Sequence, residues 1–277
     1  MEEKIKMLKE YFEKEESVLL AFLFGSRARN IQRKNADWDI GVYFTPYEYA
    51  EIDTEHTYPD ENKVREKTEE ILKGEVDFIV MNRAASPLVF SILNRGTPLI
   101  IKDRRLYLEL LLRTSQEAFE YWKFTEEFYA IRERTKSLSE EDRSILRKYL
   151  VFLENEFQDL EKFKAYTWED YFHNRDKRRN IERWVENLIM CAIDISKIIL
   201  AGEKREIPDT YREAVYRFVK KFMDEESARI FSQFVWLRNV ITHEYLDVKW
   251  EKIKKFIENA EPLFPVFIEN VREFIKR

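Results

Sequence analysis

The chain has 277 residues, of which 44% are hydrophobic and 36% are charged, and its formal net charge is −5. This length suffices for two ordinary domains, and the mixed Lys and Glu residues exclude an overall nucleic-acid-binding charge pattern. The single cysteine, Cys191, excludes an internal disulfide and fits a reducing cytoplasm. The longest apolar run, 18–24, is too short to span a bilayer, and the charged start lacks the apolar block of a signal peptide. We therefore expect a cytoplasmic protein with no membrane partner.

The first hundred residues contain short β-rich runs separated by helical patterns. A helix is expected to end at Gly74, and another to begin with Ser86 as its cap and Pro87 at its first position. These signals predict a small α/β domain with a mixed sheet over residues 1–102. The expected strands cover 18–24, 37–44, 75–81 and 99–101.

The remainder of the chain has helical periodicity almost to its end. A connecting helical segment is expected over 103–138, and a capping-box pattern near Ser137 then restarts the helix. Five amphipathic helices predict an all-α bundle over 139–277. Pro262 and Pro265 are expected to kink or break the last helix. The predicted fold class is therefore α+β, with a small mixed-sheet domain followed by a helical bundle.

Two segments of the first domain carry residues that phosphoryl chemistry uses. Gly25 and Ser26 form a turn between a buried strand and a helix, which offers N–H groups and a hydroxyl to an anion. Asp37 and Asp39 alternate on a strand, so they point to one face about 7 Å apart and offer oxygen ligands to Mg²⁺. Asp77 begins another expected strand and faces the same cleft. Each feature alone has an ordinary structural explanation, but together they predict a site for a triphosphate and a metal.

This spacing resembles the polymerase-β-type minimal nucleotidyltransferase (MNT) family, whose signature is Gly-Ser, ten residues, then Asp-x-Asp. The resemblance implies Mg²⁺ as cofactor, ATP as substrate, and transfer of a nucleotide to a hydroxyl. The site residues that it implies are Gly25, Ser26 and Arg27 for the nucleotide, Asp37, Asp39 and Asp77 for the metal, and Asp77 also as general base.

A second group of residues lies near the end of an expected bundle helix. Asn239 and His243 are four residues apart and share a face, while the long side chain of Arg238 reaches toward them. His moves protons near neutral pH, and Arg stabilises the charge of a phosphate under attack by an RNA 2′-OH, so no metal is required. A histidine at a helix C-terminus is also commonly a simple cap.

Residues 139–277 resemble the HEPN family, specifically the toxin subunit of HEPN–MNT toxin–antitoxin pairs, which carries Arg-x4-His-x-Tyr. The motif falls on Arg238, His243 and Tyr245, with Asn239 in support. The resemblance implies an RNase whose site forms in a homodimer through the bundle. It also implies that an MNT partner transfers AMP from ATP to the tyrosine and silences cleavage. Tyr245 is therefore the expected acceptor, in the same or a sister chain.

Two other interpretations stay open at this point. The chain resembles aminoglycoside-type nucleotidyltransferases too, which act on small molecules and would leave Arg238 and His243 structural. Alternatively, the HEPN half is a non-catalytic module that binds nucleotide or RNA. A basic cluster at the start of a helix is better explained as a solvated helix start than as an RNA site, and His56 and His173 have no evident partners. The cluster comprises Arg175, Lys177, Arg178 and Arg179.

Overall fold

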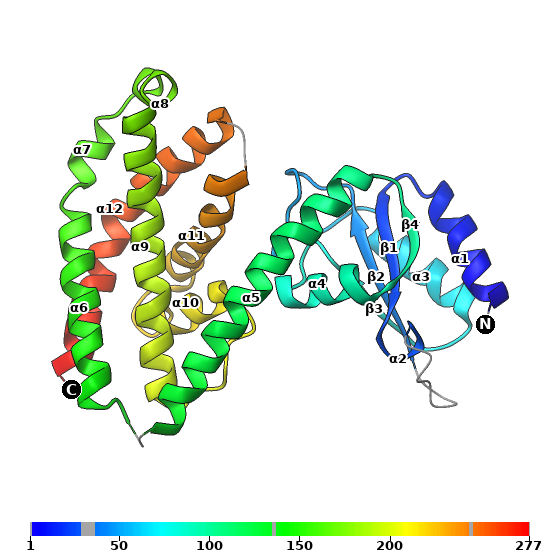
Figure 1. Cartoon of the computed structure of the whole chain (residues 1–277), viewed down its shortest axis with the longest axis horizontal. Coiled ribbons are helices and arrows are strands. Elements are labelled where there is room, and N and C mark those ends of the chain that lie inside the picture. The colour runs from blue at the N-terminus through cyan, green and yellow to red at the C-terminus, as the bar shows by residue number, and fades with distance from the viewer. Residues whose placement is uncertain (1, 29–36, 135–136, 244–245, 277) are drawn as a thin grey trace. The chain divides into compact units, whose positions relative to one another are not determined.

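The computed structural model describes residues 2–28, 37–134, 137–243 and 246–276, without the side chains of 28, 239–240, 242–243 and 246–248. The chain divides into two compact units, Met1–Trp122 and Lys123–Arg277. The long helix α5 (Arg104–Arg134) contains the division between them. Figure 1 shows a sheet with its covering helices in the first unit and a helical bundle in the second.

The first unit is built on a four-stranded mixed sheet with the order β3-β2-β1-β4. β2 and β3 are parallel, whereas β1 pairs with β2 and with β4 in the antiparallel sense. The predicted mixed sheet is therefore confirmed. The elements are α1 (Glu2–Lys14), β1 (Val18–Phe24), α2 (Gly25–Ala28), β2 (Trp38–Phe44), α3 (Glu61–Leu72), β3 (Val76–Val80), α4 (Ser86–Arg95), β4 (Thr97–Ile101) and α5.

Helices cover both faces of this sheet (Figure 1). On one face, Phe12 of α1 and Leu72 of α3 belong to a core cluster with alternate strand residues. On the other face, Ile92 of α4 and Leu110 of α5 belong to a second cluster. The strands are consequently apolar on both sides, which is why the run 18–24 has no polar alternation.

Two expected helix ends differ from the structure by one residue. α3 ends at Leu72, and Lys73, not Gly74, is its C-cap in the left-handed conformation (φ 47°). α4 has Ala85 as its N-cap, so Ser86 is already helical. The reason at α4 is a competing partner, because the Ser86 hydroxyl donates to the carboxylate of Glu117 on α5 instead of capping its own helix.

The second unit is a helical bundle, as predicted. Ser139 caps the first of its helices in a reciprocal capping box with Asp142. Of the predicted kink or break at the prolines, the break is not found, because the last helix continues through Pro262 and Pro265 while Phe264 stays fully buried. Packing of the apolar face thus outweighs the missing backbone bonds. The helices are α6 (Glu140–Phe157), α7 (Leu160–Lys164), α8 (Trp168–His173), α9 (Arg175–Gly202), α10 (Tyr211–Val219), α11 (Glu225–His243) and α12 (Leu246–Lys276).

Aromatic side chains dominate the interior of this bundle. Trp184 and Phe234 are buried. Phe234 packs against Phe256, and Phe231 stacks on Phe267, so α11 is fixed against α12 by rings on both helices. Among the helices that the structure describes, none has an apolar stretch of the length that a bilayer crossing requires.

Candidate functional site

The end of β1 and the start of β2 place a glycine directly against an aspartate. Phe24 and Asp39 are opposite each other in the antiparallel pair, and Gly25 follows with φ +69°. A Cβ atom at Gly25 would lie 2.0 Å from Oδ2 of Asp39. The Asp39 carboxylate therefore occupies space that only glycine leaves open, and the positive φ also favours glycine here.

The parallel register of β2 and β3 brings a second acid to the same place. Asp39 is directly opposite Asp77, and both lie on the face of the sheet that α4 covers. Partial burial raises the pKa of the Asp39 carboxyl above its ordinary 3.8. The negative charges of Asp77 and Asp37 raise it further, whereas the positive charge of Arg27 lowers it. The charges of Asp77 and Asp37 thus act on Asp39, whereas the binding of one metal by all three acids stays a prediction.

The acids of this site suit a metal that is bound by protein and substrate together. Among the described residues, they do not form a site in which protein side chains alone surround the metal. Over the described part of the chain, no group of three or more His, Cys, Asp or Glu side chains is close enough to hold an ion. The Asp39 and Asp77 pair nevertheless offers carboxylate oxygens from neighbouring strands. Mg²⁺ in phosphoryl-transfer sites commonly takes one or two carboxylates, with phosphate oxygens and water as its other ligands. The donor set therefore fits Mg²⁺ bound together with a nucleotide.

We expect Asp39→Asn to raise the melting temperature of the metal-free protein at neutral pH. A raised pKa means that the folded protein holds the Asp39 proton more tightly than the unfolded chain does. Ionised Asp39 therefore lowers stability above this pKa, and the variant removes that cost. The increase in melting temperature should become smaller as the pH falls toward 3.8, where the Asp39 carboxyl of the wild type is protonated. Thermal denaturation with a chelator across this range measures it, and a lower melting temperature for the variant would contradict it.

Arg27 and Ser26 follow Gly25 in the short helix α2, and both are partly exposed. The Nε–H of Arg27 donates to the backbone oxygen of Asp37 at 3.0 Å. The guanidinium carbon of Arg27 lies 4.2 Å from the centre of the Trp38 ring. Trp38 was not predicted as a site residue. It lies between two aspartates in the chain, so its side chain is on the opposite face of the strand from theirs.

The second motif is described only in part. Arg238 lies on α11, with its guanidinium carbon 6.0 Å from the ring centre of Tyr211, the first residue of α10. Tyr211 is a neighbour that the sequence did not reveal. The backbones of Asn239 and His243 continue α11, whereas their side chains and all of Tyr245 lie outside the described residues. Their convergence on Arg238 stays a prediction.

The basic cluster at the start of α9 has structural partners. Lys177 forms an ion pair with Asp170 at 2.6 Å, and Arg178 donates to the backbone oxygen of Phe172 at 3.2 Å. The side chain of Asn174 caps α9 by accepting from two backbone N–H groups. These contacts fix α8 to α9, which supports the interpretation as a helix start.

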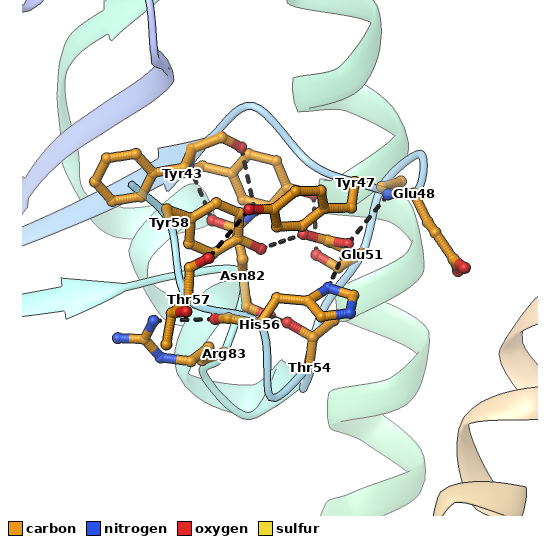
Figure 2. Close-up of polar contacts among 12 residues, drawn as sticks. Tyr43, Tyr47, Glu48, Glu51, Thr54, His56, Thr57, Tyr58, Asn82 and Arg83 are labelled. Atoms are coloured by element: carbon orange, nitrogen blue, oxygen red, sulfur yellow. Dashed lines mark hydrogen bonds and ion pairs between the residues drawn. The ribbon is translucent and has the colours of Figure 1, made fainter. Parts of the chain in front are cut away.

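A polar network closes the loop between β2 and α3 (Figure 2). Glu51 is 1% exposed, and its carboxylate accepts from the Tyr58 hydroxyl and from the Glu48 backbone N–H at 3.2 Å. Nδ1 of His56 lies 3.2 Å from the same carboxylate, so the expectation that His56 lacks a partner is wrong. The network follows the Phe44 end of β2, whereas Asp39 lies at the other end. We therefore assign it to loop folding and not to the site.

Two families match this chain in succession. Residues 6–105 match the polymerase beta nucleotidyltransferase family, and residues 153–271 match the ribonuclease HepT-like family, which confirms the predicted pair of domains. One similar protein is the tRNA nuclease HepT of Aphanizomenon flos-aquae (strain 2012/KM1/D3). It is 24% identical over 132 residues, which cover 47% of this chain and 90% of that protein.

Two solved structures are also similar to this chain. They are a toxin–antitoxin with AMP-PNP (TM-score 0.35, 22% identity) and a mutant of the toxin–antitoxin MntA-HpeT (TM-score 0.34, 20% identity). Each similarity covers 47% of this chain and 94% of the other.

Proposed function

We propose that this chain, which joins a polymerase-β-type nucleotidyltransferase domain to a HepT-like HEPN domain, is a single-chain relative of toxin–antitoxin pairs. Its first domain transfers AMP from Mg²⁺-ATP to a hydroxyl, and its second is an RNase that this transfer silences. The observation that carries the transferase is the Asp39 carboxylate, which lies against Gly25 and opposite Asp77. Fusion keeps the two domains equimolar and at high effective concentration.

The residues of the first site suit nucleotidyl transfer. Gly25 and Ser26 offer N–H groups and a hydroxyl to the phosphates, and Asp39 and Asp77 hold the cation. A Mg²⁺ ion held by Asp39 and Asp77 would neutralise phosphate charge and so would favour departure of pyrophosphate. Asp77 accepts the proton of the acceptor hydroxyl while the oxygen of that hydroxyl bonds to the α-phosphorus. The bond from that phosphorus to the bridging oxygen breaks, and pyrophosphate leaves with its electron pair.

We assign the acceptor role to Tyr245 because of its place in the second motif. It follows His243 by two residues, so AMP esterified to its oxygen brings bulk and negative charge to the RNase site. In the unmodified protein, His243 takes up the proton of an RNA 2′-OH and Arg238 holds the phosphate. A homodimer through the bundle brings two such motifs together.

Tyr245→Phe is expected to remove AMP labelling without affecting nucleotide binding. The variant lacks only the hydroxyl that attacks phosphorus. The measurement incubates pure protein with Mg²⁺ and ATP labelled at the α-phosphate, then counts label retained on the protein. Tyr211→Phe, which removes the hydroxyl of the tyrosine beside Arg238, is the matched control and should label like the wild type.

Other outcomes of this assay identify the alternative functions. Label that passes only to an added aminoglycoside, and never to the protein, indicates a small-molecule nucleotidyltransferase with a structural bundle. Absence of both labelling and RNA cleavage indicates a binding module. Label that persists unchanged in Tyr245→Phe assigns the acceptor role to another residue.

A further inference from the structure

The ring of Trp38 lies beneath the guanidinium of Arg27, at the end of β2 that also carries Asp39 but on the opposite face of the sheet. The Arg27 carbon is 4.2 Å from the ring centre, well inside the range of about 6 Å over which a cation and an aromatic face attract. The Nε–H of Arg27 also donates to the Asp37 backbone oxygen at 3.0 Å. The ring and the backbone oxygen thus both contact the guanidinium, and together they restrict its position.

Trp38 itself is held by the fold and not by any ligand. It is 5% exposed and belongs to the core cluster that α1 and α3 cover. Its backbone N–H donates to the oxygen of Glu75 at 3.0 Å, which ties it to the start of β3. A Cβ atom at Gly74 would lie 3.7 Å from Cδ1 of Trp38, so the indole edge packs against that backbone. The ring is therefore a rigid support in the absence of nucleotide.

Arg27 supplies positive charge where the acids concentrate negative charge. It lies two residues after Gly25, against which the Asp39 carboxylate packs, and its Nε–H donates to the backbone oxygen of Asp37. If Asp39 and Asp77 hold the cation of a nucleotide, the phosphate oxygens bound to that cation must lie close to these two acids. A guanidinium has N–H donors on Nη1 and Nη2 besides Nε, in a planar fork that matches phosphate oxygens.

We propose that Trp38 is a positioning residue of the transferase site. Its ring holds Arg27 in the orientation in which the guanidinium binds oxygens of the nucleoside triphosphate. This inference rests on the proposed function and adds a residue to its binding site. The juxtaposition of a buried indole, an arginine and two acids at neighbouring strand ends supports it.

The test compares two substitutions at Trp38. Trp38→Leu removes the aromatic face, so we expect a Kd about tenfold weaker for Mg²⁺ with the α,β-methylene analogue of ATP, measured by calorimetry. The ATP concentration for half-maximal labelling should rise by the same factor, while the maximal rate changes much less. Trp38→Phe keeps a ring under Arg27 and should stay within about threefold of the wild type.

Phe78→Leu is the matched control for damage to the core. Phe78 is also buried, belongs to the same cluster, and lies beneath another arginine, with the Arg65 carbon 5.5 Å from its ring centre. This variant should bind the analogue like the wild type. Equal Kd values for Trp38→Leu, Phe78→Leu and wild type would overturn the proposal, since the indole would then only fill the core.

The binding measurement separates this inference from the proposed function. A wild type that binds the analogue but transfers no AMP contradicts the proposed transfer, and the Kd comparison still decides the role of Trp38. A wild type that does not bind the analogue at all overturns both.

Discussion

Asp39→Asn is expected to lower AMP transfer by about 10³-fold while the protein stays folded. The substitution keeps the size of the side chain, so the fit against Gly25 is preserved. Asp39→Asn removes one of the two negative charges, those of Asp39 and Asp77, that hold the cation of the nucleotide in the proposed site. Transfer is measured as the initial rate of α-phosphate label incorporation at saturating Mg²⁺ and ATP.

Asp60→Asn is the matched control for this loss. Asp60 precedes α3 in the same unit, and its side chain is half-exposed, 4.0 Å from Lys63. The same change of an aspartate to an amide should therefore leave labelling unaffected. If Asp39→Asn labels at the wild-type rate, the paired acids on β2 and β3 are not the transferase site.

The second large effect is expected at His243. In the Asp39→Asn background Tyr245 stays unmodified, so RNA cleavage should be visible without prior removal of AMP. Adding His243→Ala should then lower cleavage by about 10²- to 10⁴-fold, since the group that moves the proton of the 2′-OH is lost. The measurement is the rate of cleavage of labelled tRNA in the presence of a chelator.

His173→Ala in the same background is the control for loss of a histidine from the second unit. His173 is exposed at the end of α8, and its ring contacts Phe172. Cleavage should not change. Cleavage that survives His243→Ala, or that disappears with the chelator alone, would contradict a metal-independent HEPN nuclease.

Periodicity and turn chemistry in the sequence predicted the fold class and most elements, but not the short helices α7 and α8. Runs of apolar residues located the strands to within two residues at either end, and the helical half followed from its repeating apolar faces. Positions that depend on a tertiary partner were less predictable. Ser86 donates to Glu117 instead of capping its helix, and Pro262 remains inside a helix in which Phe264 is fully buried. Local rules cannot include such partners.

The candidate site, like the fold, was predictable only where local sequence patterns decide the structure. The proximity of Asp39 to Asp77 depends on the parallel register of β2 with β3, which spacing along the chain suggested but did not fix. Trp38 and Tyr211 were missed because a ring that supports an arginine has no sequence signature apart from its burial. Glu51 was missed because its partners come together only when the loop after β2 folds.

We expect this chain to attach AMP to its own HEPN motif. The most direct test is the intact mass of the pure protein before and after treatment with Mg²⁺ and ATP, followed by location of any added mass in a peptide. An increment of one AMP on the peptide that contains Tyr245 is the predicted result. An unchanged mass in a protein that starts unmodified, or an increment on a peptide far from that motif, would contradict it.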